Sequence, residues 1–271
     1  MSIRSALFHS WVRFDQWLAA SPLLRRSGGR AQTVFFPGCS LAGYSPSYVI
    51  SVRDFLRGRR EDCGVFMACC AKPLKLMGKK GLFLKRMDGV RRGLDAMGAE
   101  TVVTACQNCY KILREYDTGR HVLSLWPLIL KMGLPEGLEG RFEGLEASIQ
   151  DSCAMNVCPE TGAAVREILK RLGVTLREME FSGQRAKCCG GAMMISTGDV
   201  KSGREWMRNR AAESPCPTII SYCASCRSAM GMDGSHKSLH LLDLIFGSGT
   251  PAEPGSALLN RYKTARNLSS L

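Results

Sequence analysis

The chain has 271 residues, of which 45% are hydrophobic and 23% are charged, and its formal net charge is +13 at pH 7. This length allows two domains of roughly 100 to 130 residues, each with a core that needs no disulfide. The sequence shows no secretory leader and no run of about 18 apolar residues, so we expect a cytoplasmic protein without a membrane span. Any association with a membrane is expected to run through partner subunits.

The positive charge does not by itself predict a nucleic-acid-binding protein. Lys and Arg are scattered along the chain, and no RNA- or DNA-binding motif occurs. The formal count also treats every cysteine as neutral, whereas ten thiolates around two clusters with cores of about +2 each would contribute roughly −6. We therefore expect acidic partners or anionic substrates rather than nucleic acid.

Residues 1–31 are predicted to form an N-terminal extension with a short amphipathic helix. Leu7, Trp11, Phe14 and Leu18 recur at spacings that place them on one helix face. The favoured interpretation is that this face packs on the helix's own domain. Docking to a partner subunit is the second interpretation, and an interfacial membrane helix is the third because the polar face carries few basic residues.

The rest of the chain alternates short strands with helices. In the first half we expect strands at 33–36, 64–68 and 101–104, helices at 47–60 and 82–97, a short helix after Cys109 and an apolar run at 122–130. In the second half we expect strands at 147–150, 174–181 and 218–222, helices at 159–172 and 200–212, and an apolar run at 239–246. This alternation predicts an α/β fold of two tandemly duplicated domains, each a small parallel sheet flanked by helices.

The predicted domain boundaries follow from the same pattern. The extension at 1–31 is followed by a first domain at 32–146 and a second at 147–247. Residues 248–271 begin with a stretch rich in Gly, Pro and Ser, and we expect them to form a flexible C-terminal tail.

Ten of the 13 cysteines form a pattern that occurs twice. Each copy has a single cysteine, an adjacent pair and a C-x-x-C motif, and equivalent cysteines are offset by 114, 119 and 117 residues. The first copy is Cys39, Cys69, Cys70, Cys106 and Cys109; the second is Cys153, Cys188, Cys189, Cys223 and Cys226. Each cysteine follows a predicted strand, and ligands of parallel α/β sheets bind at the C-terminal strand edge.

The adjacent cysteines require a sharp turn, because neighbouring side chains on an extended chain point to opposite sides. Gly190 and Gly191 follow the second pair and permit such a turn. Ala71 follows the first pair. An alanine is tolerated there if the turn keeps its φ negative.

The cysteine pattern favours iron–sulfur chemistry in a reducing compartment. Zinc uses four ligands, commonly from two C-x-x-C-like hooks, whereas each copy here offers five sulfurs. The C-x-x-C-x-x-C run of cubane clusters does not occur, and disulfide exchange at a C-x-x-C motif leaves the adjacent pairs unexplained. Zinc in one or both sites and metal-free thiol redox chemistry stay open as alternatives.

The ten cysteines resemble the paired cysteine-rich CCG domains of the disulfide-cleaving subunit of heterodisulfide reductase. The resemblance covers about residues 32–247, and it implies that each set of five cysteines binds one noncubane [4Fe-4S] cluster. It also implies that the two clusters cleave a disulfide reductively, so the ten cysteines act in catalysis through the clusters. Related iron–sulfur subunits of glycolate, lactate and glycerol-3-phosphate oxidation systems carry extra ferredoxin-type cysteines, which this sequence does not show.

The resemblance further implies partner subunits. In the heterodisulfide reductase family, the disulfide-cleaving subunit receives electrons from a ferredoxin-like iron–sulfur subunit, which is itself fed by a flavoprotein subunit. No G-x-G-x-x-G fingerprint or P-loop occurs in this chain, so we expect it to depend on such partners for electrons. Two other functions stay open: an electron-relay or redox-sensing subunit without its own substrate, and a zinc-stabilised protein without a redox function.

Five further residues are candidates for lesser roles. Lys72 and Lys187 flank the adjacent pairs and are expected either to stabilise anionic clusters or an acidic disulfide, or to be solvated. Cys63, Cys158 and Cys216 have no counterpart in the other half, and we expect them to pack in the core as small hydrophobic side chains. Of these three, Cys158 lies nearest in sequence to a candidate ligand, Cys153.

Overall fold

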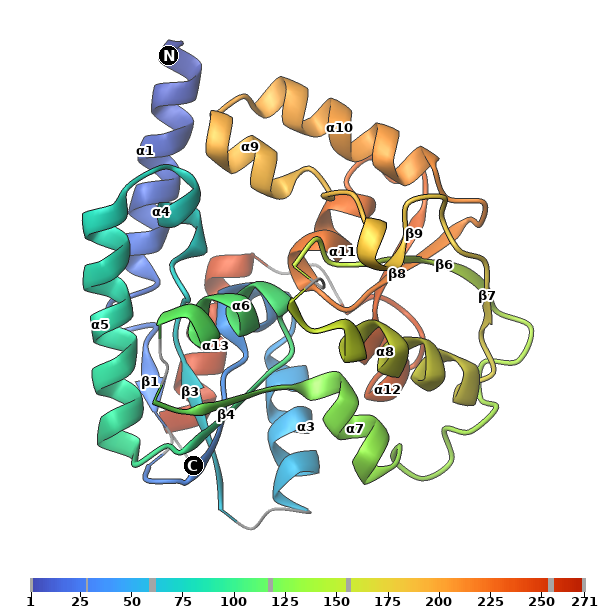
Figure 1. Cartoon of the computed structure of the whole chain (residues 1–271), viewed down its shortest axis with the longest axis horizontal. Helices are drawn as coiled ribbons and strands as arrows, with labels where there is room; N and C mark the ends of the chain where they lie inside the picture. Colours follow the sequence, from blue (N-terminus) through green and yellow to red (C-terminus); the bar gives the residue numbers. More distant parts are fainter. Residues whose placement is uncertain are drawn as a thin grey trace. The chain divides into compact units, whose positions relative to one another are not determined.

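The computed structural model describes residues 2–27, 29–58, 62–116, 119–154, 157–252 and 256–269. The chain forms two compact units. Unit 1 comprises residues 1–123, 195–200 and 253–271, and unit 2 comprises residues 124–194 and 201–252. Figure 1 shows a sheet flanked by helices in each of them.

The sheet of unit 1 has the strand order β1-β3-β2-β4-β5. Its strands are β1 (Arg26–Ser27), β2 (Thr33–Phe35), β3 (Cys63–Met67), β4 (Thr101–Thr104) and β5 (His121–Ser124). Strand β2 runs parallel to both β3 and β4. Its residue Thr33 lies opposite Cys63 of β3 and Thr101 of β4. Strand β1 is antiparallel to β3. The central strands are buried, as expected for parallel strands covered on both faces.

Seven helices belong to unit 1 among the described residues: α1 (Ile3–Leu18), α2 (Gly38–Tyr44), α3 (Pro46–Arg57), α4 (Lys72–Leu76), α5 (Lys80–Met97), α6 (Gln107–Tyr116) and α13 (Ala257–Ser269). The long helix α5 covers the sheet, and Phe83, Met87 and Leu94 share one core cluster with Phe66 and Val102. It ends before Gly98, whose left-handed conformation (φ 70°) closes the helix.

The sheet of unit 2 has the order β7-β6-β8-β9, and all of its strands are parallel. They are β6 (Glu146–Gln150), β7 (Thr175–Leu176), β8 (Thr218–Ser221) and β9 (Lys237–His240). The helices are α7 (Leu125–Met132), α8 (Pro159–Arg171), α10 (Val200–Ala212), α11 (Ala224–Met230) and α12 (Leu241–Ile245), with a 3-10 turn at Gly183–Arg185. Helix α9 (Gly191–Thr197) begins in unit 2 and ends in the 195–200 segment of unit 1.

The predicted α/β fold with two duplicated sheets is confirmed, and most predicted elements lie within two residues of the observed ones. The run at 174–181 is different, since only Thr175–Leu176 is a strand. The runs at 122–130 and 239–246 are each a strand followed by a helix. In the second run His240 and Asp243 form a reciprocal cap that starts the helix. The expected end of the helix at 47–60 lies outside the described residues.

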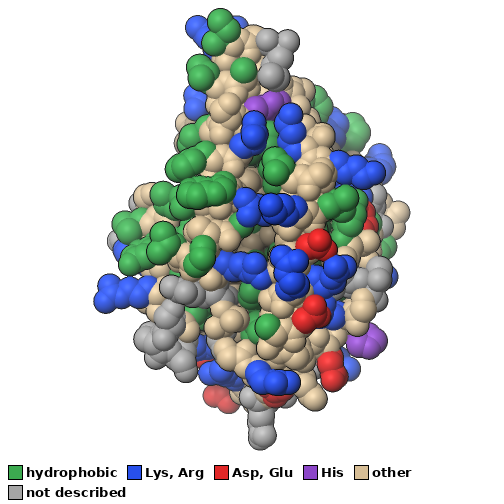
Figure 2. Space-filling model, turned by 90° about the vertical axis from the view of Figure 1, so that its left-hand side faces the viewer, with side chains coloured by type: hydrophobic (Ala, Val, Ile, Leu, Met, Phe, Trp, Pro, Cys, Tyr) green, Lys and Arg blue, Asp and Glu red, His purple; other side chains and the backbone are tan. Residues whose placement is uncertain are grey.

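The N-terminal helix does not pack through its large apolar face, so the favoured interpretation is wrong. Leu7, Trp11 and Phe14 are 66%, 63% and 57% exposed, whereas Val12 and Gln16 are buried. Helix α1 therefore packs through its smaller side chains and displays its large apolar ones. Figure 2 shows apolar side chains gathered on this side of the chain.

The predicted flexible tail is also wrong for residues 256–269, which include helix α13. Thr264, Ala265 and Leu268 are buried, and the Thr264 hydroxyl donates to the carbonyl of Ala42 in α2 at 3.2 Å. The Gly-, Pro- and Ser-rich composition describes only the segment before the helix. Residues 253–255 and 270–271 lie outside the described residues.

The boundary between the units differs from the predicted one at 146/147. Unit 2 begins at Ser124 because α7 packs against α8. None of the helices in the described part of the chain has both the length and the apolar character of a membrane span.

Candidate functional site

The first set of cysteines gathers at one edge of the unit 1 sheet. Cys39 is the second residue of α2 and follows β2; Cys69 and Cys70 follow β3; Cys106 follows β4, and Cys109 lies in the first turn of α6. Three neighbouring parallel strands thus deliver five thiols to their C-terminal edge. This is the edge at which parallel α/β sheets bind ligands.

The five thiols of unit 1 form a continuous row. The sulfur of Cys69 lies 3.3 Å from that of Cys39. Cys69 also contacts Cys70, Cys70 contacts Cys109, and Cys109 contacts Cys106. We call Cys39, Cys69, Cys70, Cys109 and Cys106, in this order, the first sulfur row.

A glycine makes room for the first sulfur row. A Cβ atom on Gly38 would lie 2.9 Å from the sulfur of Cys109, and the φ of Gly38, +72°, is in the left-handed region. Both conditions favour glycine at this position.

The thiols of unit 2 form a second row with the same order of contacts. Cys188 contacts Cys153 and Cys189, and Cys226 contacts Cys189 and Cys223. The second sulfur row is therefore Cys153, Cys188, Cys189, Cys226 and Cys223. In both rows the single cysteine touches the first of the pair, and the second of the pair touches the second cysteine of C-x-x-C. The duplication seen in the sequence is thus repeated in the sulfur contacts.

Contacts within the first row shift the pKa values of its thiols in opposite directions. Hydrogen bonds with Cys109 and Cys69 lower the pKa of Cys70 to about 5. In contrast, contacts with Cys106 and Cys70, together with burial, raise the pKa of Cys109 well above its ordinary value. One thiolate is stabilised because its neighbours stay protonated.

In the second row the pKa values are also shifted in opposite directions, but the lowered one belongs to the first cysteine of the adjacent pair instead of the second. Contacts with Cys153 and Cys189 lower the pKa of Cys188 to about 2, and contacts with Cys189 and Cys223 raise the pKa of Cys226. Ionising all five thiols of a row requires added positive charge. Iron ions would supply that charge, since Cys thiolates are the ligands that iron–sulfur clusters take. In the part of the chain that is described, no three Cys, His, Asp or Glu side chains surround a single metal-ion position; the sulfurs touch one another instead.

The turns after the paired cysteines are left-handed in both units. Ala71 has φ 55°, and it is the one non-glycine residue with positive φ among the described residues. The condition of a negative φ, under which an alanine is readily tolerated here, is therefore not met. A left-handed residue is needed to reverse the chain between the adjacent thiols and the helix that follows. Gly190, at the equivalent position, has φ 99°.

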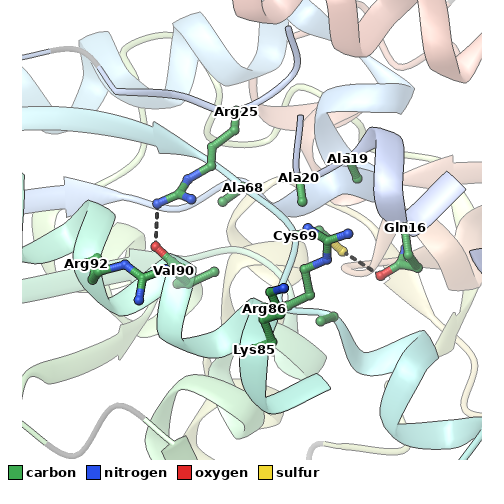
Figure 3. A pocket seen from close by; sticks show the side chains of 12 residues that line it. Gln16, Ala19, Ala20, Arg25, Ala68, Cys69, Lys85, Arg86, Val90 and Arg92 are labelled. Atoms are coloured by element: carbon green, nitrogen blue, oxygen red, sulfur yellow. Dashed lines mark hydrogen bonds between the residues drawn. The ribbon is translucent and has the colours of Figure 1, made fainter. Parts of the chain in front are cut away.

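Helices α1 and α13 contact the first row, and no local sequence pattern indicates either contact. The thiol of Cys69 donates to Oε1 of Gln16 at 3.3 Å, as Figure 3 shows. Arg261 donates from Nε to the carbonyl of Cys39 at 3.1 Å and pairs with Asp15 at 2.7 Å. Gln16 and Arg261 lie 53 and 222 residues away from the cysteines they contact.

Buried polar contacts hold the loop that leads to the second row. Asp151 is fully buried and accepts from Arg166 at 2.8 Å, from the Tyr222 hydroxyl at 3.0 Å and from the Gly183 backbone at 2.7 Å. Burial, followed by the Asp151 charge, raises the pKa of Tyr222. Because Gly183 belongs to the loop before Cys188, this network fixes the approach to the adjacent pair.

A second network reaches the same loop. The guanidinium of Arg210, which is 1% exposed, donates to Gln150 at 2.7 Å and to the carbonyl of Phe181 at 2.7 Å. The amide of Gln150 donates to the carbonyl of Lys187 at 3.2 Å. Trp206 donates to the carbonyl of Cys188 at 2.8 Å, so α10 also supports the adjacent pair directly.

Both flanking lysines have partners. Lys72 donates to the side chain of Asn108, which lies between the two cysteines of C-x-x-C. Lys187 lies 3.3 Å from a carboxylate oxygen of Glu213 and 3.4 Å from the centroid of the Phe181 ring. Stabilisation of a cluster or substrate by these lysines stays a prediction.

The remaining cysteines are buried. Cys63 lies in β3, and Cys216 precedes β8. Cys158 accepts from the Thr161 hydroxyl at 3.0 Å and lies 3.0 Å from a carboxylate oxygen of Glu160 at the start of α8. Burial of all three agrees with the expected packing role.

The two sulfur rows coincide with two matches to one family. The cysteine-rich domain model, CCG, matches residues 33–114 and 147–231, and each match contains one complete row. The chain belongs to the cysteine-rich (CCG) domain family. CCG membership and the clustered thiols indicate iron–sulfur or other metal binding. Helices α1 and α13 lie outside both CCG matches, although they contact the first row.

Other comparisons add little to the CCG assignment. No curated protein sequence matches the chain significantly. Similar solved structures include a putative Asp/Glu racemase from Yersinia pestis, at 10% identity and a TM-score of 0.33, with 88% of this chain and 98% of that chain covered. An aspartate racemase homologue from Pyrococcus horikoshii OT3 has 12% identity and a TM-score of 0.29, with 88% and 99% covered. A solute-binding protein of an ABC transporter from Conexibacter woesei DSM 14684 has 11% identity and a TM-score of 0.27, with 84% and 72% covered. These similarities are too low to bear on function.

Proposed function

We propose that this chain is an iron–sulfur subunit of a heterodisulfide reductase-like complex that reduces a disulfide or runs the reverse reaction. The observation that carries the proposal is the pair of sulfur rows, each with five thiols in the same order of contacts. Zinc uses four ligands, and thiol–disulfide exchange uses two sulfurs, so both leave thiols of each row unused. The proposed ligands are all ten cysteines, five for each of two noncubane [4Fe-4S] clusters.

The proposed net reaction is the two-electron reduction of a disulfide. The S–S bond breaks, two electrons and two protons are taken up, and two thiols form. When bound, iron–sulfur clusters transfer electrons singly. Two duplicated sites are therefore suited to a reaction that consumes two electrons, and this gives the duplication a chemical reason.

The chain's own residues hold the thiols and shield them. In unit 1, Arg261 fixes the backbone of Cys39, and Gln16 contacts the Cys69 thiol. In unit 2, the buried Asp151 and Arg210 networks fix the loop before Cys188. Several thiols of the two rows are nearly inaccessible to water, so clusters held there would be shielded from hydrolysis and loss of iron.

The electrons are proposed to come from a ferredoxin-like subunit that is fed by a flavoprotein subunit. The sequence contains no motif for binding a nicotinamide or flavin cofactor of its own. The purified chain is therefore expected to reduce no disulfide with NADH alone.

A turnover assay tests the proposal. Purified chain is given a reduced viologen as artificial electron donor and a small disulfide, and both viologen oxidation and thiol formation are followed. We expect two viologen equivalents to be oxidised for each disulfide cleaved. The Cys216→Ser variant, which alters a buried thiol outside both rows, serves as the matched control and should retain turnover. Electron transfer from viologen to another carrier without cleavage of any disulfide would contradict the reductase and support an electron-relay function.

A further inference from the structure

A face of unit 1 combines exposed apolar side chains with cations next to the first sulfur row. A groove of about 380 Å³ is lined by Phe14 and Trp17 of α1, Leu74 of α4 and Leu82 of α5. Arg13 and Arg86 also line this groove. We call these six residues, together with Leu7 and Trp11 on the same side of α1, the α1–α5 face.

The apolar part of this face is large and uncovered. Leu7, Trp11, Phe14 and Trp17 are 57% to 66% exposed, which corresponds to an exposed area on the order of 400 Å². The rings of Phe14 and Trp17 stack with centroids 5.9 Å apart, yet both stay exposed. The largest apolar patch on an ordinary monomer is of this size and often has a function. Figure 2 shows this side of the chain, with Lys and Arg side chains gathered beside the apolar ones.

Helix α1 holds this face in place. Its opposite side is buried through Val12 and Gln16, and Asp15 is paired with Arg261 of α13. His9 is hydrogen-bonded to the carbonyl of Ile195 at 2.9 Å. The exposed aromatic side chains therefore stand on an anchored helix, and a preformed surface loses little entropy on binding.

A smaller pocket of about 140 Å³ adjoins the groove, since Gln16 and Arg86 line both. Arg25, Lys85, Arg86 and Arg92 line the pocket, and so does Cys69 of the first row. Its lining includes no Asp or Glu from the described residues. Figure 3 shows Arg86 and Lys85 projecting from α5 on the side of Cys69.

The cations of this pocket have no acidic partner within the described part of the chain. There, Lys85, Arg86 and Arg92 have neither a hydrogen bond nor an ion pair, whereas the neighbouring Arg91 is paired with Asp88 at 2.7 Å. Arg25 donates to the carbonyl of Gly89 and lies over the Phe66 ring. Burial and the charge of Arg92 lower the pKa of Arg25, as expected for cations gathered without an anion.

We propose that the α1–α5 face is the docking surface for a small acidic electron-carrier protein. Its acidic side chains occupy the cationic pocket, its apolar rim covers the aromatic residues of α1, and its redox centre approaches Cys69. The partner is thus identified by charge complementarity and by the redox ligand that borders the pocket. Trp, Phe and Arg are the residue types enriched at such interfaces. This inference rests on the proposed redox function of the first row.

The size of the pocket agrees with this occupant. A cavity of about 150 Å³ holds a molecule the size of benzene, so 140 Å³ accommodates a carboxylate side chain but not a nucleotide or flavin. Opposite charge also steers carriers to a surface and speeds their encounter. A groove between three helices is a poorer match for a flat lipid surface.

The test measures binding of a small acidic [2Fe-2S] ferredoxin to the metal-loaded chain by calorimetry. We expect saturable binding that weakens about tenfold or more when the salt concentration rises from low to high. Trp17→Ser, and separately the double change Lys85→Gln with Arg86→Gln, should each weaken binding about tenfold. Trp17 and Lys85 are exposed and Arg86 is half-buried, so folding is expected to survive both changes, and thermal unfolding checks this.

Two matched controls test the location of the site. Arg91→Gln removes a cation of the same helix that lines neither hollow, and Tyr262→Ser removes an aromatic residue of α13 that is 48% exposed. Neither should change the affinity by more than about twofold. The proposal is overturned if the Trp17 and Arg86 variants bind ferredoxin with unchanged affinity. It is also overturned if the chain binds no ferredoxin. The same holds for α1-dependent binding to anionic lipid vesicles, or self-association of the chain, in place of carrier binding.

Failure of the docking proposal and failure of the proposed function give different results. A chain that binds ferredoxin through this face but cleaves no disulfide keeps the docking surface and contradicts the reductase. If the chain cleaves disulfides with reduced viologen, but changes in the α1–α5 face do not alter its affinity for ferredoxin, only the docking surface is contradicted.

Discussion

Ala71 and Gly190 occupy equivalent positions after the two pairs of adjacent cysteines, and both have left-handed backbone conformations, with φ of 55° and 99°. The surroundings of the two residues differ. Ala71 is buried in the core cluster of unit 1, whereas a Cβ atom on Gly190 would lie 2.8 Å from Met207 Cγ and 3.1 Å from the Gly203 carbonyl.

This difference predicts unequal effects of exchanging the two residues. In Ala71→Gly, relief of about 1–2 kcal/mol of backbone strain is offset by losing about 0.8 kcal/mol of methyl burial and by the greater chain entropy of glycine. The stability of unit 1 should change by less than about 1 kcal/mol. Gly190→Ala adds strain and overlap together and should cost about 2 kcal/mol or more. Thermal unfolding of both variants checks this, and equal effects would contradict the assigned turn geometry.

The second prediction concerns the contact of α13 with the first sulfur row. Arg261→Ala leaves the Cys39 carbonyl and the Asp15 carboxylate without their partner, at a cost of about 1–3 kcal/mol. Iron should be lost from the first site more readily than from the second, and total iron should fall towards half. Arg266→Ala, an exposed position on the same helix, is the control. If both variants keep full iron, α13 does not support the site.

The third prediction concerns the buried carboxylate of unit 2. Asp151→Asn keeps the shape of the side chain but removes the charge that faces Arg166, which is 27% exposed. Breaking a buried pair costs about 3 kcal/mol or more. The loop before Cys188 should loosen, so the second site should lose iron while the first keeps it. Glu178→Gln, which removes the more exposed partner of the same arginine, should cost less than about 1 kcal/mol. Equal iron loss in Asp151→Asn and Glu178→Gln would contradict this prediction.

The parallel strands and the two sets of clustered cysteines could be predicted from the sequence because both depend on local patterns. Short runs such as 33–36 and 101–104 are rich in strand-forming residues, and each strand end fixes where the next cysteine lies. The exposed face of α1 could not be predicted, because the spacing of Leu7 and Trp11 shows that a helix has an apolar side but not whether anything covers it.

Most of the other features that could not be predicted from the sequence arise from contacts between distant segments. Nothing near Gln16 or Arg261 in the sequence marks them as neighbours of Cys69 and Cys39, since the packing of α1 and α13 on unit 1 brings them there. The helix at 257–269 was obscured by the composition of the segment before it. The left-handed turn at Ala71 could not be predicted, because alanine rarely adopts that conformation.

The fourth prediction tests whether the adjacent cysteines are ligands. Cys189→Ser replaces a thiolate by a mostly protonated hydroxyl of similar size, so the fold should survive. The second cluster should be lost or rebuilt with four cysteines, and disulfide reduction should disappear in either case. Cys216→Ser, at a buried thiol outside both rows, should change neither the cluster spectrum nor turnover. An unchanged cluster spectrum with full turnover in Cys189→Ser would exclude the adjacent cysteine as a ligand.

The most direct test of two five-cysteine iron–sulfur sites is the iron, acid-labile sulfide and zinc content of the anaerobically purified chain. Two four-iron clusters predict about 8 iron and about 8 sulfide per chain, with zinc near zero. About two zinc per chain with no iron would contradict the assignment of both sulfur rows, and the proposed redox function would fall with it.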